Sequence, residues 1–194
     1  MKYIIVIIPI LLLFSCTNDI YDMDTIDFSK FKSDAVIIKD SYDQLIAKKG
    51  TPDDMRWTTF RRYNDDGFSL KDSTLILSYY PEGIMYVLNV DSVRIYRINF
   101  DRTQGNIYYG NLVFNRGFTM NDALKKFEIE DLDFFYASDY SAMIGFDSSG
   151  YLLSLFPEPR YDNDSYTFYF GEDSCLKGIN FPIYLYENHK QKRN

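Results

Sequence analysis

The sequence predicts an α+β fold, rich in strands, in which two tandem units each pack one short helix against an antiparallel four-stranded sheet. Helix-start signals occur at Ser41 and again at Thr119, 78 positions later. Strand-like runs follow each signal, so the order of helix and strands repeats. The chain also holds 18 Tyr and 16 Phe residues, which favour strands because aromatic side chains pack across neighbouring strands.

The two predicted helices begin at capping residues. Ser41 and Gln44 have the spacing of a capping box, in which the Ser hydroxyl accepts from the backbone amide three residues later. Gly50 can adopt the left-handed conformation that ends a helix, so the first helix is predicted over 41–49. The second is predicted over 119–127, where Thr119 and Asp122 form a looser version of the same start.

The predicted strands form two groups and two additional runs. The first group covers 55–63, 73–80, 84–90 and 93–100. The second group covers 132–136, 142–146, 151–156 and 166–170, and the additional runs are 106–114 and 176–185. Within 93–100 the apolar residues change face after Ile95, which predicts either a β-bulge or a strand that is covered on both sides.

The helices are too short to be stable alone, since isolated helices below about 12–15 residues are marginal in water. Each must therefore lay an apolar side on the sheet of its unit. In the first unit we expect these core residues: Leu45, Ile46, Leu75, Leu77, Ile95 and Ile98. In the second unit we expect these: Ala123, Leu124, Phe127, Leu153, Leu155, Phe168 and Phe170.

The beginning of the chain has the three parts of a secretory signal: a positive start at Lys2, an apolar run over 3–14, and the small residue Ser15 before the cut. The apolar run is short for a membrane span, which needs about 20 residues. The segment from Leu13 to Cys16 resembles the lipobox of bacterial lipoproteins, with Phe14 bulkier than the usual residue. An ordinary secretory signal with an incidental Cys is the alternative.

The lipobox resemblance implies cleavage between Ser15 and Cys16 and attachment of lipid to the Cys16 sulfur. The chain would then be anchored to a membrane of the cell envelope, and we expect the outer membrane. Acidic residues after Cys16 resemble the surface-export signals of some lipoproteins, which leaves the periplasmic and surface faces both open. The predicted organisation is a signal peptide over 1–15, a lipidated flexible tether over 16–33, the two units over 34–105 and 106–186, and a basic tail over 187–194.

Two local segments carry a second resemblance. Residues 45–53 resemble the helix–Gly–x–Pro segment of small outer-membrane-assembly lipoproteins, and Gly117-Phe118-Thr119 resembles the helix entry in the same group. Those proteins share a fold with the β-lactamase inhibitor protein, which implies tandem helix-and-sheet units and a non-catalytic class. The chain departs from the pattern at Lys49, where a Leu is usual, and it has no Cys pair for the inhibitor's disulfides.

Composition and site chemistry argue against several function classes. The formal net charge of -7 argues against nucleic acid as a partner, because that affinity comes from cations that neutralise phosphates. The single His, at 189, lies in the basic tail, where it cannot act as a rigidly held catalytic base. One His and Cys175 cannot supply the three or four ligands of a zinc site. We therefore expect no enzyme, no cofactor and no metal, and we expect Cys175 to be a small buried apolar residue.

Other polar clusters have plain structural interpretations. Glu128, Glu130, Asp131 and Asp133 form the densest acidic run, which we interpret as a solvated connection; an envelope hydrolase using an acid pair is the alternative function. The acidic segments 64–67 and 162–165 are typical of turns rather than calcium loops. Four arginines are expected to face water from strands, with an anion site as the lesser alternative: Arg61, Arg62, Arg94 and Arg97.

Tyrosines on predicted strands are the remaining candidates for a binding surface. Tyrosine offers contact area and a hydroxyl at a low cost in conformational entropy. The candidate surface consists of Tyr79, Tyr80, Tyr86, Tyr166 and Tyr169, and the competing interpretation is that most of them lie in the core. The expected function is a non-catalytic envelope lipoprotein that binds a protein through a sheet face or loop edge. A glycan ligand and an immunity or inhibitor role are the alternatives within binding.

Overall fold

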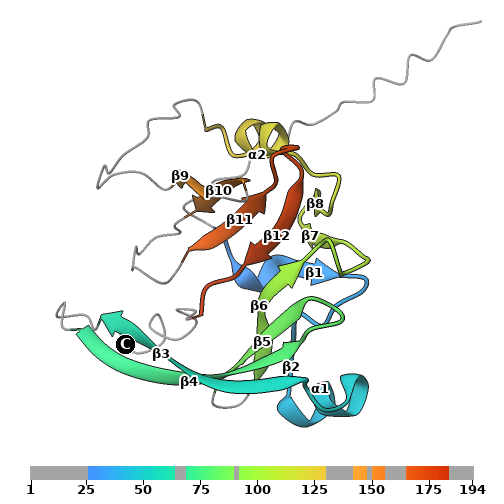
Figure 1. Ribbon diagram of the computed structural model, residues 1–194, viewed down its shortest axis with the longest axis vertical. Coiled ribbons are helices and arrows are strands. Elements are labelled where there is room, and N and C mark those ends of the chain that lie inside the picture. Colours follow the sequence, from blue (N-terminus) through green and yellow to red (C-terminus); the bar gives the residue numbers. More distant parts are fainter. Residues whose placement is uncertain are drawn as a thin grey trace, which may run out of the picture.

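The computed structural model describes residues 26–63, 69–89, 92–129, 142–147, 150–155 and 165–183. Strands dominate these residues (Figure 1). The elements of the first half are η2 (Phe28–Lys30), β1 (Phe31–Ser33), β2 (Lys39–Asp40), α1 (Tyr42–Lys49), β3 (Asp54–Tyr63), β4 (Ser69–Tyr79), β5 (Ile84–Leu88) and β6 (Val93–Asn99). Those that follow are β7 (Ile107–Tyr109), β8 (Leu112–Phe114), α2 (Met120–Lys126), β9 (Ala142–Asp147), β10 (Gly150–Leu155), β11 (Tyr166–Phe170) and β12 (Leu176–Asn180).

The strands of the described residues form one large and one small antiparallel sheet. The large sheet has the order β3-β4-β5-β6-β12-β11-β10-β9, and β2 also pairs with β6. The small sheet has the order β1-β7-β8. In Figure 1 β3 and β4 sweep along the bottom of the molecule as a long curved hairpin, and the small sheet lies beside β6 and β12.

The prediction of an α+β fold with two tandem helix-and-sheet units is wrong. β6, from the first half of the chain, pairs with β12, from the second half, and Ile98 lies opposite Ile179. The two groups of strands therefore belong to one continuous sheet. In two separate sheets β6 and β12 would each have an unpaired edge here, and their pairing supplies the missing hydrogen-bonding neighbour to both. The described chain is β-rich, and its two short α-helices lie at the periphery of the molecule (Figure 1).

The capping residues predicted to start the two helices are confirmed. The Ser41 side chain accepts from the Gln44 amide at 3.2 Å, and α1 ends at Gly50, whose φ is +79°. At α2 the Thr119 side chain accepts from the Asp122 amide at 3.1 Å, while the Asp122 carboxylate accepts from the Thr119 amide at 2.9 Å. Each capping pair satisfies amides that the first helical turn cannot satisfy internally.

The predicted change of face in β6 is confirmed as a β-bulge. Tyr86 lies opposite Ile95 and Met85 lies opposite Arg97, so Tyr96 is the additional residue on β6. Before the bulge Val93, Arg94 and Ile95 are all buried. The strand is thus both bulged and covered on both sides at this end, and the bulge returns Ile98 to the side of the core.

The main core lies on one side of the large sheet, which we call the inner face, although Ile76, Val87 and Arg94 are also buried on the opposite side. Five of its residues, one on each of five neighbouring strands, are almost fully buried: Leu77, Tyr86, Ile98, Ile179 and Phe168. The small sheet packs on this face through Phe114, whose ring centroid is 5.2 Å from that of Phe168. Most expected core residues are buried here, including Leu45 and Ala123, whereas Ile46, Leu75 and Leu124 are only partly buried.

Residues 26–33 belong to the core, and their predicted role as flexible tether is wrong. Ile26, Phe28 and Phe31 are 7%, 4% and 5% exposed. The Phe31 ring lies 4.7 Å from Tyr109, 5.5 Å from Tyr166 and 5.2 Å from Phe181, measured between centroids. The apolar residues are spaced irregularly because this segment combines a 3-10 turn with a short strand, so they show no helical or strand period. Residues 16–25 and 187–194 lie outside the described part.

Arg94 is buried, and its predicted exposure to water is wrong. Its side chain is 1% exposed. The guanidinium donates to the Pro182 carbonyl at 2.7 Å and to the Ile183 carbonyl, and it lies 5.6 Å from the centre of the Phe28 ring. One cation therefore ties the central strand β6 to segments near both ends of the described chain. None of the helices in the described ranges is long and apolar enough to cross a membrane.

Candidate functional site

The structure separates the five candidate tyrosines. Tyr79, Tyr86 and Tyr166 are 4%, 0% and 1% exposed. They are core residues, so their predicted place in a binding surface is wrong. The register explains this result, because Tyr79 and Tyr86 lie on the same face of the sheet as buried Leu77. Burial raises the pKa of the Tyr79 and Tyr86 hydroxyls, since the charged form loses its hydration.

Tyr80 and Tyr169 remain accessible. Tyr80 is 45% exposed, and its hydroxyl donates to the Asp54 carboxylate at 3.0 Å. The Tyr169 ring lies 5.5 Å from the Arg97 guanidinium, and its hydroxyl accepts from the Asn180 side chain at 2.7 Å. These two tyrosines lie on the side of the large sheet opposite the core, which we call the outer face.

An exposed apolar strip lies at the β3 edge of the large sheet. Trp57, the one Trp in the sequence, is 72% exposed, and Met55 on the same strand is 52% exposed. Trp57 lies opposite Leu75 on β4, which lies opposite Leu88 on β5, and both leucines are partly buried. We call Met55, Trp57, Leu75 and Leu88 the β3 edge patch.

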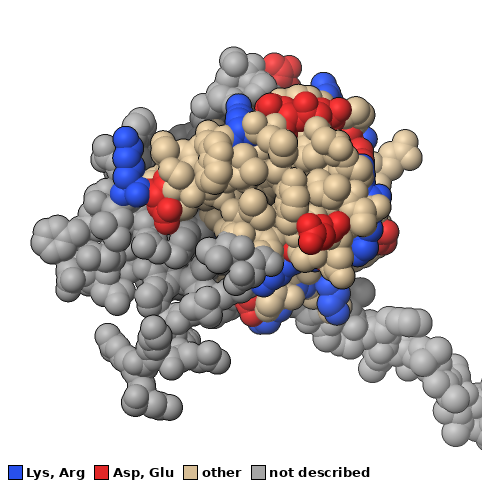
Figure 2. Space-filling model, turned by 90° about the horizontal axis from the view of Figure 1, so that it is seen from below, with Lys and Arg blue, Asp and Glu red and all other residues tan. Residues whose placement is uncertain are grey.

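The β3 edge patch continues the inner face beyond the part that is covered. Met55 lies opposite Leu77, which is fully buried. Within the described residues β3 pairs only with β4, so no other described strand covers its second edge. Figure 2 shows the molecule from the side on which β3, β4 and α1 lie, and the charged side chains stand mostly around the rim of this face.

Sequence reasoning missed the β3 edge patch. Its signal was present as alternation along β3, where Met55 and Trp57 are separated by Arg56 and followed by Thr58. Alternation predicts one apolar side, and an apolar side is usually assigned to the core. The exposure arises because the inner face is covered at Leu77 and Tyr86 but not at Trp57.

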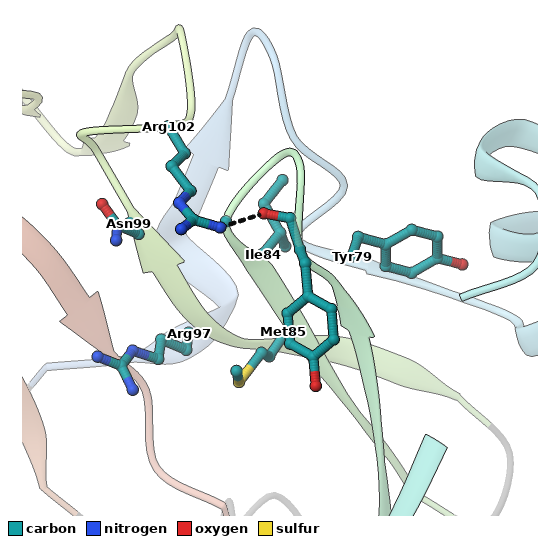
Figure 3. Close-up of a pocket in the computed structure, with 8 residues that line it drawn as sticks. Tyr79, Ile84, Met85, Arg97, Asn99 and Arg102 are labelled. Atoms are coloured by element: carbon teal, nitrogen blue, oxygen red, sulfur yellow. Dashed lines mark hydrogen bonds between the residues drawn. The ribbon is translucent and has the colours of Figure 1, made fainter. Parts of the chain in front are cut away.

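A second surface is a small open hollow on the outer face, with a volume of about 110 Å³. We call it the outer-face hollow, and its lining residues are Tyr79, Tyr80, Gly83, Ile84, Met85, Arg97, Asn99 and Arg102. Figure 3 shows Arg97, Asn99 and Arg102 around one side of it and Met85 beneath. The Arg102 guanidinium donates to the Tyr80 carbonyl at 2.9 Å.

A close approach of backbone at Gly83 fixes the shape of this hollow. A Cβ at position 83 would lie 2.9 Å from Arg102 Cβ and 3.0 Å from Asn99 Cβ. The φ of Gly83 is +68°, a conformation that side-chain-bearing residues rarely adopt. The turn between β4 and β5 can therefore press against the loop after β6 only with glycine at this position.

The other sequence candidates do not assemble into a site in the described residues. Glu128 is exposed, while residues 130–133, 64–67 and 162–164 lie outside the described part. The side chains of Arg61 and Arg62 also lie outside it. Cys175 is a free thiol of intermediate burial, less buried than predicted. No group of three metal-ligating side chains occurs among the residues that the structure describes.

Two surfaces therefore stand out by geometry, the β3 edge patch and the outer-face hollow. The first offers apolar area at a strand edge that no other described strand pairs with. The second offers two guanidinium groups beside an aromatic ring. Comparison with known proteins adds no assignment to either one. No family model matches the chain, and no curated protein and no solved structure shows significant similarity to it.

Proposed function

We propose that the chain is a lipid-anchored protein of the cell envelope that binds another protein through the β3 edge patch and catalyses no reaction. The exposure of Trp57 at 72% carries this proposal. Burying a large aromatic side chain on binding removes a large apolar area from water, and Trp is enriched among residues that dominate interface energies. A Trp this exposed beside Met55 lowers the solubility of the protein unless a partner covers it.

The strand edge supports a particular mode of binding. An extended segment of a partner can pair with the edge of β3 that no described strand occupies and place alternate side chains over Met55 and Trp57. The sequence of β3 holds three arginines, at 56, 61 and 62, against one acid, Asp54. In a chain of net charge -7 this local excess of positive charge favours an acidic partner segment.

The binding proposal is tested by photo-crosslinking in cells that make the protein. We expect a photoreactive residue in place of Trp57 to give one discrete crosslinked heteromer, because this position lies at the centre of the contact. The matched control is the same substitution at Val113, an exposed apolar residue (38%) on β8. Equal products from positions 57 and 113 contradict the proposal, as does a product that contains only this chain.

The anchoring proposal rests on the lipobox resemblance at 13–16 and is tested at Cys16. We expect Cys16→Ala to accumulate as uncleaved precursor and to lose all labelling by radioactive palmitate, because the acyl chains attach at this residue. The control is Cys175→Ala, which removes the other thiol and should leave labelling unchanged. Processing of Cys16→Ala at the same place, with lipid still attached, shows that the segment is an ordinary secretory signal.

A further inference from the structure

We infer that the outer-face hollow binds the carboxylate of an acidic sugar, of the uronic acid class. The eight residues that line it include two arginines, Arg97 and Arg102, and no acid. Neither guanidinium forms an ion pair with a carboxylate of the described residues, whose ion pairs involve Lys48, Lys49, Arg116 and Lys177. Two cations that face one hollow without a counter-charge favour an anionic ligand.

Both guanidinium groups are held in place before any ligand binds. Arg102 is fixed by its hydrogen bond to the Tyr80 carbonyl, on a loop that packs tightly against Gly83. Arg97 lies over the Tyr169 ring, and the Tyr169 hydroxyl is itself held by Asn180. Because each side chain already has a partner that orients its donors, part of the entropic cost of ordering them on binding is removed.

The chemistry of the lining indicates a carboxylate. The planar fork of donors on a guanidinium matches the two oxygens of a carboxylate. A hollow of about 110 Å³ is well below the roughly 300–1,000 Å³ of pockets that enclose whole small molecules. It can take a carboxylate and a few neighbouring atoms, while the rest of the ligand lies on the exposed part of the outer face around Tyr80 and Arg97.

The surface beside the hollow indicates a sugar. The register aligns a row of hydrogen-bonding side chains across three strands of the outer face, namely Arg97, Asn180 and Thr167. Neighbouring strands lie about 4.8 Å apart, so the row spans about 10 Å. It ends at Ser154 on β10, which is buried and bonded to Thr167. The Asn180 side chain is partly exposed, and its buried oxygen has no hydrogen-bond partner in the described residues, so a turn of this side chain would offer the oxygen to a sugar hydroxyl. The exposed Tyr80 ring offers an apolar surface to the C–H side of a sugar ring.

The inference is tested by titrating the full-length protein with D-glucuronate, D-glucose and inorganic phosphate in a calorimeter. We expect saturable binding of glucuronate and at least tenfold weaker binding of glucose, which has the same ring without the carboxylate. Arg97→Met and Arg102→Met should each weaken glucuronate binding tenfold or more. The matched control is Lys125→Met, which removes an exposed cation on α2, outside the hollow, and should leave binding unchanged.

The same titrations can overturn the inference. It fails if glucuronate shows no saturable binding, if glucose binds equally well, or if phosphate binds as tightly as glucuronate, which would indicate a general anion site. It also fails if Lys125→Met weakens binding as much as the hollow variants do. Should a Met variant lower the melting temperature, Arg97→Lys and Arg102→Lys replace it. These variants keep the charge but lose the fork, so unchanged glucuronate binding in both overturns the carboxylate assignment.

Discussion

Phe31→Ala is expected to lower the free energy of unfolding by about 3–5 kcal/mol, the range for truncating a buried Phe. Phe31 is 5% exposed and contacts the rings of Tyr109, Tyr166 and Phe181. Truncation leaves a cavity among these rings, which belong to three different parts of the chain. Urea unfolding followed by circular dichroism measures the loss.

The control for Phe31→Ala is Lys32→Ala, one position later on the same short strand. Lys32 is exposed, so its truncation should change stability by no more than about 0.5 kcal/mol. The contrast tests whether residues 26–33 are part of the core. If both variants unfold at the same urea concentration as the unchanged protein, this segment contributes no packing and its burial is without energetic effect.

Arg94→Ala is expected to cost about 3 kcal/mol or more, since it removes two hydrogen bonds from a charged donor, each contributing about 1.5–3 kcal/mol. The carbonyls of Pro182 and Ile183 lose the guanidinium that binds them. The Phe28 ring loses the cation that packs on it. Urea unfolding measures this change as well, and limited proteolysis should detect loosening around residues 182–183.

Two variants isolate the cause of the Arg94 effect. Arg97→Ala removes the next arginine of the same strand, which is exposed and lies over the Tyr169 ring, and should cost no more than about 1 kcal/mol. Arg94→Met keeps much of the buried volume but removes the donors. If Arg94→Met is as stable as the unchanged protein, packing rather than hydrogen bonding accounts for the role of Arg94.

Local structure could be predicted from the sequence because its causes are local. The capping pairs at Ser41 and Thr119 involve residues three positions apart, and both helices start as predicted. The strands between 54 and 114 follow from runs of apolar and β-branched residues, and the bulge in β6 follows from the change of face after Ile95. None of these features requires knowledge of what the segment packs against.

The pairing of distant segments could not be predicted in the same way. Nothing within β6 or β12 specifies that Ile98 will lie opposite Ile179, 81 positions later. Similarly, the carbonyl partners of Arg94 lie 88 and 89 positions away, and without them the sequence predicts that an arginine on a strand faces water. For the same reason some of the candidate tyrosines are buried and others are exposed: exposure depends on which face of the large sheet is covered.

The position of β12 in the large sheet has a consequence for the order of folding. β12 is the last strand of the described chain, yet it lies between β6 and β11. During synthesis the strands before it cannot join into one sheet until residues 176–180 have emerged, so β6 keeps an unpaired stretch of edge from its own synthesis until then. Sheets closed by such non-local pairing fold on the millisecond-to-second scale, and open edges invite pairing with other chains in the meantime. We therefore expect truncation before residue 176 to yield aggregating chains rather than a smaller folded protein.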